Sequence, residues 1–335
     1  MPSAPFFIMA SPRSGTTLLE RLLNRHSRLY VPPETAYFYH LKRLGLLGRE
    51  PTQKFIELFV DIYLDTEASR LLNLGEPCVV KKALLEGATN YEDVFINLLG
   101  MLKKIGEKPI VGEKTPHHLR SYEYILTKFT DSKVICVIRE GRAVVKSCLA
   151  HPHWEHNLLA ASRGWRRDAL CMRALLASEW AERVHVVRYE NLVVNPRFVL
   201  KGICDFLGEQ FEITMLESSG QMAVPSRHFE YYQKSWMRKS TTDFDPSRAY
   251  AWKKEYSSCE LALVERLISS ELEHFGYDVC AGNSFGWQPL LIKEFVCHLL
   301  YRFRRKVLSI CTSSPNVAKL VAAMKTTPQA SDSEK

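Results

Sequence analysis

A short apolar strand, followed directly by a glycine-containing turn and a helix, is the feature that most restricts the fold of this chain. The run Phe6–Ala10 is apolar, Pro12-Arg13-Ser14-Gly15-Thr16-Thr17 follows it, and a helical pattern opens at Leu18. A glycine in such a turn lets the backbone approach an anion, while successive N–H groups and the helix N-terminus attract its charge. The stretch therefore predicts a phosphate-binding loop in an α/β sheet.

The same turn differs from the loop that binds nucleoside triphosphates. That loop has the pattern G-x-x-x-x-G-K-[ST], in which the Lys contacts the β- and γ-phosphates and the hydroxyl holds Mg²⁺. Here Ala10 stands at the first Gly and Thr16 stands at the Lys. We therefore expect a phosphate-bearing ligand other than ATP.

Size and charge are typical of a globular protein that binds an anion. The chain has 335 residues, of which 46% are hydrophobic, so it has room for one large domain or two small ones. Its formal net charge of +8 suits an anionic ligand. Because no dense block of Lys and Arg occurs outside the C-terminal region, nucleic acid is not an expected partner.

The cysteines and the N-terminus bear on the compartment. Nine cysteines are scattered without a C-x-x-C pair, and an odd, unclustered set is typical of reduced thiols. Nothing before Phe6 resembles a signal peptide, and no run of 18 or more apolar residues occurs. The sequence thus predicts a cytoplasmic protein without a membrane span.

Short β-branched runs alternate with helical patterns along the chain. Further strands are expected at residues 108–112, 133–138 and 183–189. Helices are expected at residues 53–64, 91–105, 117–129, 141–150, 158–178, 196–207 and 260–274, with Asn195 as the N-cap before Pro196. This alternation predicts an α/β fold of P-loop-like type, a doubly wound and mainly parallel sheet flanked by helices.

A second candidate anion site follows the strand at residues 133–138. Arg139 ends that strand, Gly141 permits a turn, and Ser147 lies two turns into the next helix. An Arg fork and a Ser hydroxyl can bind a second phosphate. A surface Arg and a solvated helical Ser are the alternative.

Two further residues are candidates for chemistry. Glu34 follows Pro32-Pro33, where a Glu is more often a helix-start residue. Lys114, in Gly112-Glu113-Lys114-Thr115-Pro116-His117, comes at the end of a predicted strand, where doubly wound sheets bind ligands. A salt bridge from Glu113 or Lys114 is an equally good interpretation of that segment. His151, His153 and His156 do not have the spacing of a metal site, so no metal is predicted there.

Together these motifs resemble the sulfotransferase family, which uses 3′-phosphoadenosine 5′-phosphosulfate (PAPS) as donor. The resemblance runs from Phe6 to about Trp252. The Pro-Arg-Ser-Gly-Thr-Thr segment looks like the family's 5′-phosphosulfate loop, and the stretch from Val137 to Ser147 looks like its 3′-phosphate motif. Arg13 stands where many cytosolic members carry Lys, which is the pattern of the tyrosylprotein and bacterial-type branches.

The resemblance implies a role for each matched residue. It implies Glu34 as the catalytic base, Lys114 as the cation that reaches the sulfonate, and Arg13 as a further charge on the donor. Residues implied in donor binding are Arg13, Ser14, Gly15, Thr16, Thr17, Arg139, Ser147 and Tyr189, the last near the adenine. The family's final donor motif corresponds either to Arg238-Lys239-Ser240 or to the segment from Arg248 to Lys253. The loop after the 3′-phosphate helix, with Trp154, is expected to face the acceptor.

The expected reaction is therefore transfer of a sulfuryl group from PAPS to an acceptor hydroxyl of a glycan, a peptide tyrosine, or a small alcohol or phenol. Cationic side chains would do the work of Mg²⁺, so no metal is required by this scheme. The alternatives are a P-loop nucleotide kinase or another phosphotransferase, which would need the absent loop Lys, and a catalytically silent nucleotide-binding relative.

The C-terminal part is expected to differ from the rest. We expect a sulfotransferase domain over residues 1–283, an amphipathic helical extension over 284–324 and a disordered tail over 325–335. Apolar residues recur at helical spacing over residues 289–311, with Lys and Arg on other faces. Such a helix packs on its own domain or a second protomer, or lies on an anionic membrane surface.

Overall fold

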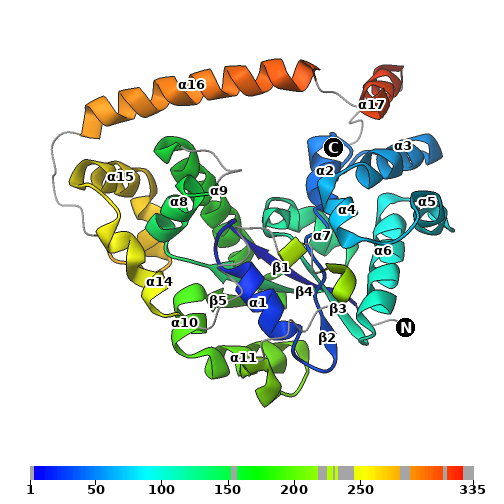
Figure 1. Cartoon of the computed structure of the whole chain (residues 1–335), viewed down its shortest axis with the longest axis horizontal. Helices are drawn as coiled ribbons and strands as arrows, with labels where there is room; N and C mark the ends of the chain where they lie inside the picture. The colour runs from blue at the N-terminus through cyan, green and yellow to red at the C-terminus, as the bar shows by residue number, and fades with distance from the viewer. Residues whose placement is uncertain are drawn as a thin grey trace.

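The central element of the protein is a five-stranded parallel sheet. The computed structural model describes residues 4–151, 157–217, 225–228, 231–232, 245–279, 287–311 and 315–326. Within these residues the sheet has the order β2-β3-β1-β4-β5 (Figure 1). Its strands are β1 (Phe6–Ala10), β2 (Leu29–Tyr30), β3 (Ile110–Lys114), β4 (Lys133–Ile138) and β5 (Val184–Arg188), all paired in parallel. The predicted doubly wound α/β fold is confirmed.

Both faces of the sheet are buried, as the strand sequences require. Successive side chains of a strand point to opposite faces, and in β1 the side chains of Phe7 and Met9 belong to one apolar cluster while those of Phe6 and Ile8 belong to another. All of them are at most 2% exposed. A strand with continuous apolar sequence is thereby covered by helices on both sides, which is typical of a parallel sheet.

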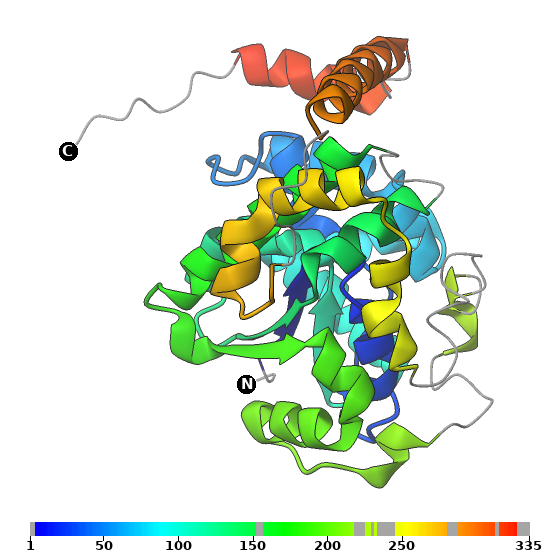
Figure 2. The same cartoon turned by 90° about the vertical axis from the view of Figure 1, so that its left-hand side faces the viewer.

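Helices supply the two outer layers (Figures 1 and 2). The cluster that contains Phe7 takes residues from α2 (Tyr37–Arg43), α3 (Gln53–Leu64), α4 (Glu67–Leu72), α5 (Pro77–Leu85), α6 (Tyr91–Gly106), α7 (Tyr122–Lys128), α8 (Gly141–Leu149), α9 (Leu158–Leu176) and α15 (Ser258–His274). The cluster that contains Phe6 takes residues from α1 (Thr16–Leu23), α10 (Tyr189–Val194), α11 (Pro196–Leu207) and α14 (Ser247–Tyr250).

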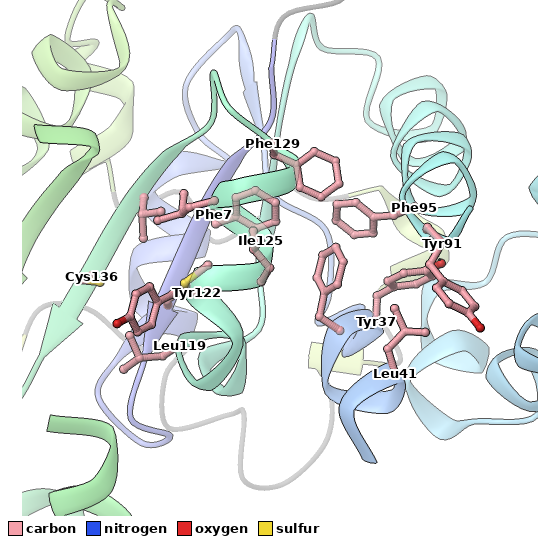
Figure 3. Close-up of a cluster of buried hydrophobic side chains, with 14 of the residues drawn as sticks. Phe7, Tyr37, Leu41, Tyr91, Phe95, Leu119, Tyr122, Ile125, Phe129 and Cys136 are labelled. Atoms are coloured by element: carbon pink, nitrogen blue, oxygen red, sulfur yellow. Dashed lines mark hydrogen bonds between the residues drawn. The ribbon is translucent and has the colours of Figure 1, made fainter. Parts of the chain in front are cut away.

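Aromatic rings dominate the larger cluster (Figure 3). Phe7 of β1 stacks on Phe95 of α6 with ring centroids 6.0 Å apart, and both rings contact Phe129. Tyr37 of α2 packs against Phe95 and donates a hydrogen bond from its hydroxyl to the Tyr91 carbonyl at 2.7 Å. These contacts hold α2, and with it the segment just before α2, against the sheet.

Several elements begin or end away from the predicted residues. β3 is two residues later than predicted because its last residues, Glu113 and Lys114, are buried charges with partners rather than apolar side chains. The predicted helix over residues 117–129 is a 3₁₀ helix over Pro116–Ser121 followed by α7. Asn195 precedes α11 as predicted, but its side chain makes no capping hydrogen bond.

Two helices follow the main domain. α16 (Trp287–Cys311) contacts α9 and α15, and α17 (Pro315–Thr326) packs on α3 with Leu320 1% exposed. The last two residues of α17 fall in the segment 325–335 that is predicted to be disordered, and the remainder of that segment lies outside the described residues. No helix in the described part of the chain is long and apolar enough to cross a membrane.

Candidate functional site

The candidate site lies where three neighbouring strands end. β1 lies between β3 and β4, so the turn after β1, Lys114 at the end of β3 and Arg139 just after β4 meet at one edge of the sheet. Ligands of doubly wound sheets bind outside the carboxyl ends of the strands. The topology thus brings together the three motifs that the sequence singled out separately.

The turn after β1 has the backbone of an anion-binding loop. Arg13 and Gly15 both have left-handed backbone angles, with φ of 68° and 90°. Such residues turn successive N–H groups toward one point. A Cβ on Gly15 would lie 2.3 Å from the Tyr189 ring, so only glycine fits this position. α1 begins at Thr16, two residues earlier than predicted, which adds the amides of its first turn to the loop.

Ser14 has an unsatisfied hydroxyl in this loop. Its side chain is fully buried, and its Oγ has no hydrogen-bond partner among the described residues. A buried hydroxyl without a partner costs free energy unless a ligand or water completes it. The residues present therefore fit a phosphate or sulfate oxygen bound at the N-terminus of α1.

The second predicted anion site is joined to the first. Arg13 Nε donates a hydrogen bond to Ser147 Oγ of α8 at 3.1 Å. Arg139 donates to the carbonyl oxygens of Arg13 at 3.0 Å and Arg248 at 3.2 Å, and its guanidinium lies 4.2 Å from the centroid of the Tyr189 ring. Burial lowers the pKa of the Arg13 guanidinium, and the nearby Arg139 charge lowers it further. A bound anion would relieve this electrostatic cost.

The segment from Arg248 to Lys253, predicted as the last donor motif, touches Arg139 through its backbone. Arg248 reaches Arg139 through its backbone carbonyl, while its side chain pairs with Asp245 at 3.1 Å. Lys253 is exposed, and its ammonium lies 5.3 Å from the centroid of the Tyr250 ring. A role of these two side chains in donor binding stays a prediction. The alternative segment Arg238-Lys239-Ser240 lies outside the described residues.

Lys114 and Glu34 form the centre of the site. Lys114 Nζ lies 2.8 Å from Glu34 Oε1, 3.0 Å from Glu20 Oε2 and 3.2 Å from the Tyr231 hydroxyl. Lys114 and Glu20 are fully buried, whereas the Glu34 side chain is 35% exposed. Glu34 precedes α2 rather than starting it. The pair therefore offers one carboxylate, that of Glu34, which a ligand from solvent can reach. Next to it is the Lys114 ammonium, which the buried Glu20 holds in place.

Two carboxylates keep the lysine charged. Burial alone would lower the pKa of the Lys114 ammonium, but Glu20 and Glu34 raise it well above its usual value. Burial raises the pKa of the Glu20 carboxyl, and this is opposed by Lys114 and by a hydrogen bond from the Tyr232 hydroxyl. A lysine held in the charged form is suited to stabilise negative charge that develops on a ligand.

Glu113 fixes the backbone on which Glu34 is carried. Thr35, the residue after Glu34, donates from Oγ1 to Glu113 Oε1 at 2.7 Å, and Thr115 donates to the same oxygen at 2.6 Å. The other oxygen, Oε2, lies 2.8 Å from Nδ1 of His118. Although burial acts to raise the pKa of the Glu113 carboxyl, His118 and these hydrogen bonds hold it below its usual value. Of the salt bridges considered for this segment, the one from Lys114 is present, and Glu113 is held by hydrogen bonds and by the contact with His118.

Sequence reasoning missed three members of the site. Glu20 lies in the pattern Leu18-Leu19-Glu20-Arg21-Leu22-Leu23, where a Glu looks like a solvated helical residue. Tyr231 and Tyr232 lie in a segment that predicted no element, yet they are 5% and 1% exposed. An acidic residue within an apolar helix stripe is the one signal that could have drawn attention to Glu20.

No group of three or more metal-ligating side chains of His, Cys, Asp or Glu occurs among the residues that the structure describes. Of the three histidines considered for a metal, only His151 is described, and it is buried. The loop with Trp154 lies outside the described residues.

The sequence of the chain is similar to those of known proteins. A model of the Sulfotransferase family matches residues 5–212. Protein-tyrosine sulfotransferase 2 of Gallus gallus is 26% identical over 235 residues, which cover 65% of this chain and 55% of that protein. The protein-tyrosine sulfotransferase of Drosophila melanogaster is 24% identical over 207 residues, which cover 60% of this chain and 37% of that protein.

The solved structures agree on the fold. The sulfotransferase domain of the Synechococcus PCC 7002 olefin synthase superimposes with a TM-score of 0.60 at 24% identity, covering 83% of this chain and 96% of that domain. The chain spans 26% to 65% of the length of the curated relatives considered. The match therefore covers the domain that carries the site rather than whole relatives.

Proposed function

The chain belongs to the sulfotransferase family, and we propose that it transfers a sulfuryl group from PAPS to an acceptor hydroxyl, with Glu34 as the base. The observation that carries the proposal is the Lys114–Glu34 pair, 2.8 Å apart, at the strand ends that also present the loop at Arg13. A partly exposed carboxylate beside a buried cation supplies the two groups that such a transfer needs. It offers one site for a proton and one charge for the leaving oxygen.

The donor would bind along the loop and Arg139. The amides of residues 14–17 and the unpartnered Ser14 hydroxyl suit the oxygens of the 5′-phosphosulfate. Arg139 and Ser147 are the candidates for the 3′-phosphate, since both lie beside Arg13 in the folded chain. Tyr189, whose ring contacts Arg139 and lies against Gly15, presents an aromatic surface for the adenine side of the donor.

The proposed transfer exchanges one bond to sulfur for another. The acceptor oxygen forms a bond to sulfur while the bond from sulfur to the bridging oxygen of the donor breaks, and 3′-phosphoadenosine 5′-phosphate leaves. Glu34 accepts the proton of the acceptor hydroxyl, a contribution typically of about 10²–10⁴-fold. Lys114 and Arg13 stabilise the charge that develops on the bridging oxygen. The acceptor is a hydroxyl of a glycan, a peptide tyrosine, or a small alcohol or phenol.

Two observations favour this reaction over the alternatives. Thr16 stands where a nucleotide kinase needs its loop Lys, so the loop lacks the side chain that contacts the γ-phosphate in that class. A silent nucleotide-binding relative would not need the buried network behind Lys114.

We also propose a cytoplasmic location for the protein. Seven cysteines among the described residues are in no disulfide, which is compatible with it.

Labelled transfer tests the proposal directly. The purified protein is incubated with radiolabelled PAPS in three separate reactions. Each reaction contains one acceptor: a tyrosine peptide, a glycosaminoglycan fragment or a simple phenol. We expect label on one of these classes, and loss of labelling in Glu34→Gln. Calorimetry with 3′,5′-bisphosphoadenosine and with ATP and Mg²⁺ gives the donor preference. Equal or tighter binding of ATP with Mg²⁺ would contradict the proposal.

A further inference from the structure

α16 has one side that packs on the domain and an opposite side that does not. On the inner side, Glu294 accepts a hydrogen bond from the Leu158 amide at the start of α9 at 2.8 Å, and its carbonyl accepts one from Asn157 at 2.9 Å. Leu290 packs against the main apolar cluster, and Trp287 lies under the Arg266 guanidinium at 4.7 Å. These contacts fix the rotation of the helix about its axis.

The outer side of the same helix is apolar and exposed. Four large side chains there are between 46% and 66% exposed, namely Ile292, Phe295, Val296 and Leu299. Their spacing of three, four and seven residues places them on one face of a helix. α16 lies along the edge of the molecule in both views, and no described helix or strand lies beyond it (Figures 1 and 2). A contiguous apolar face of this kind marks an interaction surface.

The charges in and after α16 indicate what covers its apolar face. α16 contains five basic residues and one acidic residue, and four of the basic ones fall within residues 302–306. From Phe295 to Ala330 the sequence has six Lys and Arg and no Asp or Glu. An apolar stripe with a concentration of basic residues is complementary to a lipid surface with anionic headgroups. A symmetric dimer through this face would instead bring two positively charged helices together.

We propose that α16 is an interfacial helix that docks the protein on an anionic membrane surface. Ile292, Phe295, Val296 and Leu299 would enter the headgroup and acyl boundary, while the positive charge of the segment 302–306 would favour an anionic surface. Glu294 anchors the helix to α9, so the whole domain would be held at the membrane with it. The helix would lie in the plane of the surface, in line with the absence of a spanning helix from the described residues.

Vesicle sedimentation of the full chain tests this docking. Vesicles of phosphatidylcholine with 30% phosphatidylserine are compared with vesicles of phosphatidylcholine alone, at about 0.1 M and about 0.5 M salt. We expect the apparent partition coefficient to be at least tenfold higher on the anionic vesicles at low salt. Phe295→Ser with Leu299→Ser should lower it at least tenfold, and Arg304→Gln with Arg305→Gln should lower it severalfold.

Phe198→Ser is the matched control. Phe198, on α11, is 81% exposed and lies in a different part of the fold, so its removal should leave vesicle binding and the melting temperature unchanged. Light scattering of the wild type and the Phe295/Leu299 double variant gives the oligomeric state. Binding that is equal on neutral and anionic vesicles, absent from both, or lowered as much by Phe198→Ser would overturn the proposal. So would a dimer that the double variant converts to a monomer.

Discussion

The Lys114 ammonium lies 3.0 Å from the Glu20 carboxylate, and both side chains are completely buried. Lys114 ends β3 and Glu20 lies on α1, the helix that begins at the phosphate-binding loop. The pair therefore joins the cation of the site to the loop itself. A buried ion pair contributes little net stability when intact, but loss of one partner leaves the other charge uncompensated.

Lys114→Ala should consequently lower both stability and turnover. Glu20 would remain buried without its cation, which costs about 3–5 kcal/mol of unfolding free energy. If the ammonium stabilises the leaving oxygen, kcat and kcat/KM should fall together by roughly 100- to 1000-fold. Single-turnover rates and urea unfolding measure the two effects, and Lys114→Arg should restore only part of the rate because its planar group does not replace a compact charge.

The double variant Lys114→Met with Glu20→Gln separates the two roles. It removes both charges at once, so stability should return to within about 1–2 kcal/mol of the wild type, whereas turnover should stay at the level of Lys114→Ala. Recovery of turnover along with stability would show that Lys114 serves only the fold.

Glu34→Gln should abolish most turnover without loss of the fold. The amide keeps the shape of the carboxylate but cannot take a proton, so kcat should fall at least about a hundredfold. Binding of 3′,5′-bisphosphoadenosine should change little, because the phosphate loop is formed by other residues. A variant that keeps near-normal turnover would leave Glu34 only as the exposed partner of Lys114.

The parts of the site that follow a strand directly were predictable from the sequence. The turn at residues 12–17 and the Arg139 motif are local patterns, and the parallel topology then requires their strand ends to meet. Glu34 and Lys114 were candidates from their local sequence and received their roles from the family resemblance, and the structure adds that they touch.

The buried support of the site was not predictable, because it depends on contacts between distant segments. Glu20 meets Tyr232 across 212 residues, and Tyr231 meets Lys114 across 117. The position of Glu20 within an apolar helix stripe is the one local signal, and it does not identify these distant partners. β3 was misplaced for the same reason, since the burial of Glu113 and Lys114 depends on polar partners from other elements.

Arg139→Ala should cost more free energy of donor binding than free energy of unfolding. A charge-assisted contact to phosphate is worth about 1.5–3 kcal/mol, so the Kd for 3′,5′-bisphosphoadenosine should rise roughly tenfold to more than a hundredfold. Arg183→Ala is the matched control, because Arg183 also donates to backbone carbonyls, those of Leu126, Phe129 and Ser132, but far along the chain from the loop. Calorimetry should show unchanged nucleotide affinity for Arg183→Ala. Equal losses in both variants would mean that Arg139 acts through the fold alone.

Acid should destabilise the protein through His117. Burial, with the nearby Arg120 charge, lowers the pKa of His117 from its usual 6.5 to about 3. As pH falls below 6.5 the unfolded chain takes up a proton at this residue, while the folded chain does not until about pH 3. The unfolded state thus binds more protons in this window, so the free energy of unfolding decreases as pH falls.

Replacing this histidine should remove its share of the pH dependence. Between pH 7.5 and pH 5.0 the contribution is on the order of 1–2 kcal/mol, so urea unfolding of His117→Gln should show a smaller loss of stability over this interval than the wild type. The comparison is made within each protein, so any constant cost of losing the ring contact with Tyr39, at 5.3 Å, cancels. An identical pH difference in the two proteins would mean that His117 takes up its proton equally in the folded and unfolded states.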